Sequence, residues 1–233
     1  SLRQKFRLAF LEDNNGMQPD YAEAHNNLGN AQKELGKFQE AEAAYRQSIA
    51  LEPGYAEAYS NLGLTLQEMG KLEEAESSHR QAISLKFNSA KAHNDLGVVL
   101  RELDRSVEAE TSHRQAIALQ SDYVDAFVNL GITLQELGRL EEAEANYKQA
   151  IVLKPDHTLA YQNLGITQYL NGDLDSACKI VEKVVSIDPK SKNYRLLLRI
   201  LNSRKVHKKN EVKISNTDKI GCVSGLTSNP LIL

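Results

Sequence analysis

The chain of 233 residues contains no tryptophan and only two cysteines, two methionines and five prolines. Cys178 and Cys222 make neither a disulfide framework nor a metal-binding spacing, and a reducing compartment is the default for such a chain. No run of 18 or more apolar residues is present, which excludes a membrane-spanning helix. The first residues mix charges with apolar side chains and carry no cleavage motif. We therefore expect no secretory signal and a cytoplasmic location.

Acidic residues outnumber basic residues in most of the chain, whereas basic residues predominate at one end. Residues 190–233 carry ten Lys or Arg and two acidic residues, a net charge of +8, whereas the remainder carries −11. Such a separation of charge acts on long-range attraction and on the choice of partner, and it does not determine the fold. It predicts a partner that is basic or neutral rather than acidic.

One sequence pattern recurs with a period of 34 residues. The first copy reads AEAHNNLGNAQKELGKFQEAEAAYRQSIALEP from Ala22, and similar strings start at Ala56, Ala90, Val124 and Thr158. Each copy has two stretches with apolar residues at helical spacing, which predicts a helix hairpin. A residue that can adopt the left-handed conformation is needed to leave the first helix, and these positions hold Gly36, Gly70, Asp104, Gly138 and Gly172.

Small residues recur where the two helices of each hairpin are expected to cross closely. Gly63 in the first stretch and Ala75 in the second are examples that return in every copy. Leu62 and its equivalents are expected to be buried between neighbours. A single hairpin of this size cannot bury its apolar side alone, so the copies must stack.

The pattern A-x-x-N-L-G, followed by a turn residue, resembles the tetratricopeptide repeat family over residues 22–191. The resemblance implies an all-α fold, a right-handed α-α superhelix of five helix-turn-helix repeats whose first helices line a concave groove that holds peptides or proteins. The wording is most similar to the repeat arm of O-linked N-acetylglucosamine transferases and to bacterial multidomain repeat proteins. The five repeats are expected at 22–55, 56–89, 90–123, 124–157 and 158–191.

The residues outside the repeats are expected to differ in role. Residues 1–21 are interpreted as an N-terminal helix that covers the end of the stack. Residues 192–205 carry apolar side chains on one helical face and are interpreted as a C-terminal capping helix. Residues 206–233 are interpreted as a basic tail or as the start of a further domain.

The position before each Leu-Gly pair is the first candidate for partner binding, because it faces the groove that the resemblance implies. Transferase arms of this family use an asparagine ladder here. An asparagine amide offers an acceptor and a donor, which suits a peptide backbone, whereas an aspartate only accepts. The alternative is that these side chains are solvated or bond to the neighbouring first helix. The positions hold Asn27, Asn61, Asp95, Asn129 and Asn163.

Further groove positions mix polar and apolar side chains. Leu64, Val98 and Ile132 form a stripe that either anchors a partner or packs only against adjacent helices. A carboxylate clamp for chaperone tails is a weaker match, because Asn26 and Asp95 stand where it requires cations. The recurring Glu34, Glu68, Glu102 and Glu136 favour basic or neutral partners, with a preference that weakens in salt. The remaining candidate groove residues are Asn30, Lys91, Gln67, Arg101 and Gln135.

No catalytic or metal-binding constellation is found in the sequence. His79 and His113 share a repeat position with Tyr45 and Tyr147, which indicates an aromatic packing position. The basic residues are not interleaved with stacking aromatics, so nucleic-acid binding is not expected. We predict a non-enzymatic scaffold without cofactor that binds a protein or peptide segment, away from membranes. The alternative is a substrate-docking arm of a larger enzyme of glycosyltransferase or oxygenase type, with a catalytic domain beyond Leu233.

Overall fold

The computed structural model describes residues 19–187 and 198–203, and within these ranges the chain is helical and contains no strand. The predicted all-α fold of helix-turn-helix hairpins is confirmed. The chain divides into two units, Ser1–Leu153 and Lys154–Leu233. The helices of the first unit are α2 (Pro19–Glu34), α3 (Phe38–Leu51), α4 (Ala56–Glu68), α5 (Leu72–Leu85), α6 (Ala90–Glu102), α7 (Ser106–Leu119), α8 (Val124–Glu136) and α9 (Leu140–Leu153).

The turn inside each hairpin has the left-handed residue that the sequence predicts. Gly36 has a φ of 72° and Gly138 has a φ of 75°, and the same position in the third hairpin is taken by Asp104 at 59°. After Gly36, the backbone N–H of Lys37 donates to the carbonyl of Gln32 at 2.9 Å. This bond spans five residues and closes the end of the first helix, as in the Schellman motif.

The two helices of each hairpin in the first unit cross at a glycine and a ring. A Cβ atom at Gly29 would lie 2.6 Å from Cε1 of Tyr45, and one at Gly63 would lie 2.7 Å from Cε1 of His79. These separations are far below ordinary van der Waals contact, so any side chain at these glycines would push the helices apart. The close crossing predicted from the small residues is therefore confirmed.

The hairpins of the first unit bury apolar clusters between neighbouring repeats. One cluster joins Tyr45 of α3 to Leu62 and Leu66 of α4 and to Val99 of α6. Leu66 is 1% exposed, and burying a leucine side chain this fully stabilises the fold by about 1.5–3 kcal/mol. Because the cluster takes side chains from three hairpins, no single hairpin would keep its core if isolated.

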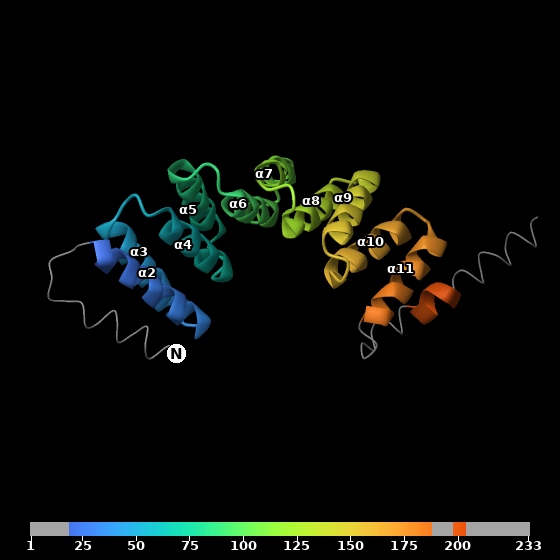
Figure 1. Ribbon diagram of the computed structural model, residues 1–233, viewed down its shortest axis with the longest axis horizontal. Helices are drawn as coiled ribbons and strands as arrows, with labels where there is room; N and C mark the ends of the chain where they lie inside the picture. The colour runs from blue at the N-terminus through green and yellow to red at the C-terminus, as the bar shows by residue number, and fades with distance from the viewer. Residues whose placement is uncertain (1–18, 188–197, 204–233) are drawn as a thin grey trace, which may run out of the picture. The chain divides into compact units, whose positions relative to one another are not determined.

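Successive first helices contact one another, from α2 to α4, from α4 to α6 and from α6 to α8. Among the described residues, the backbones of successive second helices, such as α3 and α5, are not in contact. The first unit therefore curves with its first helices on the inside, and Figure 1 shows α5 and α7 outward of α4 and α6. We call the surface of α2, α4, α6 and α8 the inner face, and that of α3, α5, α7 and α9 the outer face.

The second unit contains α10 (Thr158–Leu170), α11 (Leu174–Ile187) and a helical segment at residues 198–203. Leu201 of that segment is 3% exposed and packs with Ala177, Cys178 and Val181 of α11. Most of the predicted N-terminal helix at 1–21, part of the predicted capping helix at 192–205 and all of the tail at 206–233 lie outside the described residues, as does Cys222.

Candidate functional site

The inner face carries the ladder positions that the sequence singles out, and their amides bond along the stack. Nδ2 of Asn61 on α4 donates to Oδ1 of Asn26 on α2 at 3.0 Å. Asn26 is 1% exposed, and its own Nδ2 donates to the hydroxyl of Tyr55 at 3.5 Å. The amide plane of Asn61 is thus fixed by a buried asparagine of the preceding repeat. This contact corresponds to one of the alternatives that the sequence left open, namely that a ladder asparagine bonds to the neighbouring first helix.

The same arrangement recurs two repeats later. Nδ2 of Asn129 on α8 donates to Oδ1 of Asn94 on α6 at 3.0 Å, and Asn94 is buried near Tyr123. Burial, followed by the charges of Asp95 and Asp125, raises the pKa of Tyr123 to about 12. The phenol therefore keeps its proton throughout the physiological range.

Asp95 takes the ladder position between these two tethered asparagines. Its carboxylate is 12% exposed and pairs with Nζ of Lys91, one turn earlier on α6, at 2.9 Å. Lys33 on α2 lies close enough to Lys91 and Asp95 for both charges to act on its pKa. The pKa of Lys33 is lowered, mainly by burial; the charges of Glu68 and Asp95 oppose this, and the charge of Lys91 adds to it. The negative charge expected from Asp95 in mid-groove is therefore largely balanced by Lys91.

One rim of the inner face is closed by hydrogen bonds between repeats. Gln67 donates to Glu102 at 2.9 Å, and Arg101 donates to Glu136 at 3.1 Å. Glu136 also accepts a hydrogen bond from Ser106 at 3.2 Å. The acidic residues that were expected to attract a basic partner are thus partly occupied by side chains of the stack itself.

The other predicted site residues differ in exposure and in partners. Asn30 accepts a hydrogen bond from the hydroxyl of Tyr45 at 2.8 Å, and Gln135 accepts one from the hydroxyl of Tyr147 at 3.3 Å. Asn27 is exposed on α2. The buried Nδ2 of Asn163, on α10 in the second unit, has no hydrogen-bond partner among the described residues. The stripe residues Leu64, Val98 and Ile132 are half-buried.

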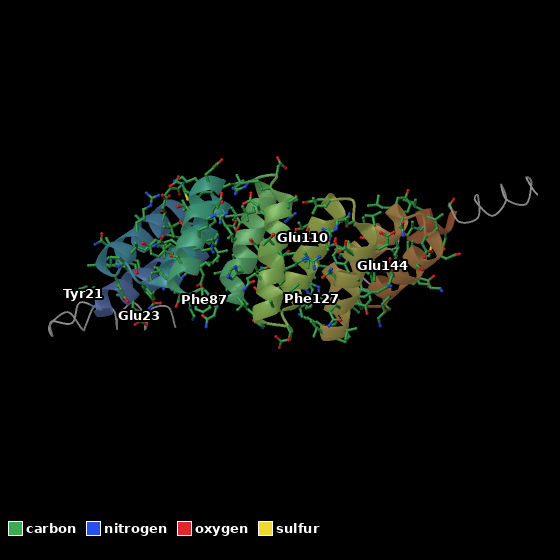
Figure 2. All side chains as sticks on the ribbon, turned by 90° about the horizontal axis from the view of Figure 1, so that it is seen from above. Tyr21, Glu23, Phe87, Glu110, Phe127 and Glu144 are labelled. Atoms are coloured by element: carbon green, nitrogen blue, oxygen red, sulfur yellow. The ribbon has the colours of Figure 1, made fainter. Side chains whose placement is uncertain are left out.

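The outer face is crossed by ion pairs that link one repeat to the next. Nη1 of Arg139 reaches Glu110 and Nη1 of Arg105 reaches Glu76, each at 2.6 Å. Figure 2 is viewed from above and labels Glu110 among the side chains of these helices. Arg139 also donates hydrogen bonds to Glu142, and these lower the pKa of the Glu142 carboxyl group. These arginines and glutamates of the outer face therefore find their partners within the chain.

Sequence reasoning missed the supporting residues on both faces. Asn26 and Asn94 stand one residue before a ladder position, and Tyr55 and Tyr123 recur 68 residues apart, so a comparison of alternate repeats would have drawn attention to them. The outer ion pairs had a clearer signal, because a cation follows the turn residue in each of the first four repeats. These cations are Lys37, Lys71, Arg105 and Arg139.

The described residues offer no obvious centre for metal chemistry and no membrane segment. Within residues 19–187 and 198–203, no group of three or more His, Cys, Asp or Glu side chains is placed to hold a metal ion. None of the helices in the same ranges has the length and apolar character that crossing a bilayer requires. The inner face is instead a protein surface that carries hydrogen-bonding side chains in fixed orientations.

Comparison with known proteins agrees with the helix-hairpin fold. Family models described as tetratricopeptide repeat match residues 22–55, 44–77 and 159–191, and one described as TPR repeat matches residues 134–172. A search of curated proteins finds no significant match. The matched segments fall in the first two and the last two of the repeats expected from the sequence.

Solved structures of similar fold include MamA, which is 29% identical, with a TM-score of 0.64, over 70% of this chain and 95% of that chain. PilW, a type IV pilus biogenesis factor, is 25% identical, with a TM-score of 0.70, over 76% of this chain and 82% of that chain. YrrB, described as a TPR protein with an unusual peptide-binding site, is 22% identical, with a TM-score of 0.64, over 85% of this chain and 99% of its own. The chain belongs to the tetratricopeptide repeat family.

Proposed function

We propose that the chain holds an extended segment of another protein against its inner face. The observation that carries this is the repeated tethering of the ladder asparagines. The hydrogen bonds to Asn26 and Asn94 use one amide hydrogen of Asn61 and of Asn129. Each amide keeps its carbonyl oxygen and a second hydrogen for a partner, in an orientation that is already fixed.

The fixed orientation gives the proposal its energetic basis. A side chain that must be ordered on binding costs about 0.5–1.5 kcal/mol of entropy, and this cost is lower when the free protein already holds it. Asp95, held by Lys91, supplies an acceptor between the two asparagines. The groups along α4, α6 and α8 then offer the kinds of donor and acceptor with which an extended backbone pairs, without reading its side chains.

Apolar anchors are proposed to supply the remaining affinity. Leu64, Val98 and Ile132 occupy one repeat position and are half-buried, so each retains surface that a partner can cover. Burial of apolar surface contributes about 25 cal/mol per Å². A segment with apolar side chains at regular intervals would fit this stripe.

We propose a preference for a basic or neutral partner because the stack leaves some of its acidic side chains exposed. Glu23, near the start of α2, and Glu57, in the first turn of α4, are exposed and belong to this inner face. Glu102 and Glu136 contribute less, because Gln67 and Arg101 already bond to them. The attraction should weaken as ionic strength rises, since exposed charges are screened over about 10 Å at 0.1 M salt.

The test is a pull-down with the full chain, comparing the unchanged protein with the double variant Asn61→Ala and Asn129→Ala. Asn146→Ala is the matched control, because Asn146 lies on outer helix α9 and bonds only to the carbonyl of Glu142 in its own helix. We expect the double variant to lose a captured protein that the control retains, with both variants keeping their thermal melting above the assay temperature. Equal capture by the double variant and the control would refute the role of the ladder.

A further inference from the structure

Two histidines lie fully buried in the core of the central repeats. His79 of α5 and His113 of α7 are both 0% exposed. Neither ring nitrogen of either histidine has a partner among the described residues. Tyr45 fills the same position in the first repeat, but its hydroxyl donates to Asn30. The positions that correspond to Asn30 hold Leu64 and Val98 in the histidine-containing repeats, which removes that acceptor.

Each imidazole packs directly against a glycine of the facing helix. A Cβ atom at Gly63 would lie 2.7 Å from Nε2 of His79, and one at Gly97 would lie 2.7 Å from Nδ1 of His113. A ring packed this closely against backbone leaves no space for water on that side. Because a protonated imidazole carries two N–H donors, the charged ring would be buried with neither donor satisfied.

The charged groups near the two rings do not compensate for this burial. For His79 these are Asp95 and Lys91 on α6 and Lys33 on α2, of which only the carboxylate favours a charged ring. For His113 the group is Arg101 on α6, which disfavours it. Burial, as the main cause, lowers the pKa of His79 to about 4 and that of His113 to about 3.

The direction of the pH effect follows from these values. An exposed histidine in an opened hairpin takes up a proton near pH 6.5, whereas the closed hairpins keep both rings neutral well below that. Between these limits the opened state binds more protons than the closed state, so the closed state loses stability as the pH falls. Above pH 6.5 the effect disappears.

We propose that His79 and His113 form an acid-sensitive latch that holds α4 against α5 and α6 against α7 at neutral pH and loosens both hairpins in mildly acidic solution. Repeat stacks open locally, because each repeat contacts only its neighbours, so two adjacent weakened hairpins are enough to disturb the centre of the stack.

Loosening the latch would also act on the inner face. Gly63 follows the ladder residue Asn61 by two positions on α4, and Gly97 follows Asp95 in the same way on α6. A helix that moves away from its imidazole therefore moves its ladder residue. Release of a bound segment on acidification is the consequence, and it depends on the function proposed above, whereas loosening of the hairpins does not.

Hydrogen exchange of the full chain, without a partner, tests the latch. We expect protection of backbone amides in α4 to α7, corrected for intrinsic rate, to fall by about tenfold for each histidine between pH 7 and pH 5.5. Protection in α8 and α9, where Tyr147 fills the position, should change less. Carboxylates titrate mostly below this range, so the comparison isolates the histidines. Unchanged protection in α4 to α7 would overturn the latch.

Variants make the assignment specific. His79→Phe with His113→Phe should remove the pH response, because tyrosine rings already fit the position in the first and fourth repeats. His25→Phe, at a half-buried position of α2, should leave the pH response intact. If the double variant does not fold, NMR of the unchanged protein decides, with neutral rings expected for His79 and His113 at pH 5.5. Rings that are charged while the hairpins stay protected would overturn the latch.

Partner binding separates the latch from the proposed function. Loss of a captured protein at pH 5.5 by the unchanged chain, but not by the double phenylalanine variant, supports release through the latch. Retention of the partner at pH 5.5 while α4 to α7 lose protection would overturn release and leave the latch in place. A chain whose inner face captures nothing at pH 7 fails the proposed function alone, since the exchange measurement needs no partner.

Discussion

Replacing Gly131 with alanine gives a direct test of the crossing between the first and second helices. A Cβ atom at this position of α8 would lie 2.5 Å from Cε1 of Tyr147 and 2.8 Å from its Cδ1 and Cζ. The ring is 0% exposed, and its hydroxyl donates to Gln135, so it has no free space into which to withdraw. The added methyl group must therefore separate α8 from α9.

The size of the effect follows from two opposing contributions. Overpacking a well-filled core costs about 1–3 kcal/mol. Alanine regains about 1 kcal/mol of helix propensity over glycine. Because the shortfall from ordinary contact is close to 1 Å, we place the packing cost at the upper end and expect a net loss of about 2 kcal/mol in the free energy of unfolding.

Gly165→Ala is the matched control within the same chain. Gly165 holds the same repeat position on α10, but the nearest atom to its Cβ would be Cγ2 of Ile180 at 3.2 Å, and Val181 replaces the tyrosine. Small adjustments of an isoleucine suffice there, so the variant should be neutral or more stable by up to about 1 kcal/mol. Urea unfolding followed by circular dichroism measures both. Equal destabilisation by the two variants would refute the steric reasoning.

Two further predictions concern the turns and the outer face. Asp104→Gly should stabilise the chain by up to about 1 kcal/mol in urea unfolding, because Asp104 has a φ of 59° that glycine adopts without strain. Destabilisation would contradict this. Arg105→Met should lower the melting temperature by about 3 °C or less, with a difference that shrinks in 1 M salt, because its pairs with Glu76 and Glu108 are partly exposed. Lys148→Met, which loses a pair within its own helix, is the control, and a salt-independent effect of Arg105→Met would count against the ion pairs.

The fold was largely predictable because its determinants are local and repeated. A glycine after each first helix is required by a positive φ, and Gly36 and Gly138 show that value. The glycine of the first helix and the ring of the second recur at the same separation in the first four repeats, so one of these crossings predicts the others. The exception, Asp104, was visible in the sequence and occupies the same left-handed conformation.

The site was less predictable because its hydrogen bonds run between repeats. The 34-residue period identifies Asn61 as a ladder position, but only the stack shows that Asn26 of the preceding repeat orients it. Likewise, Asp95 reads as an unbalanced charge until Lys91 is placed one turn away on the same helix. The buried imidazole of His79 was identified as a packing residue, whereas its lack of a partner depends on where Leu64 lies.

Site-specific photocrosslinking tests most directly whether partners bind through the first helices. A benzophenone amino acid is placed at Leu64 on the inner face in one protein and at Val107, which is 68% exposed on α7, in another. Each full chain is irradiated with the protein that the unchanged chain captures. A crosslink from position 64 and none from position 107 is the predicted result. Crosslinking from position 107 alone, or equally from both, would contradict binding to the inner face.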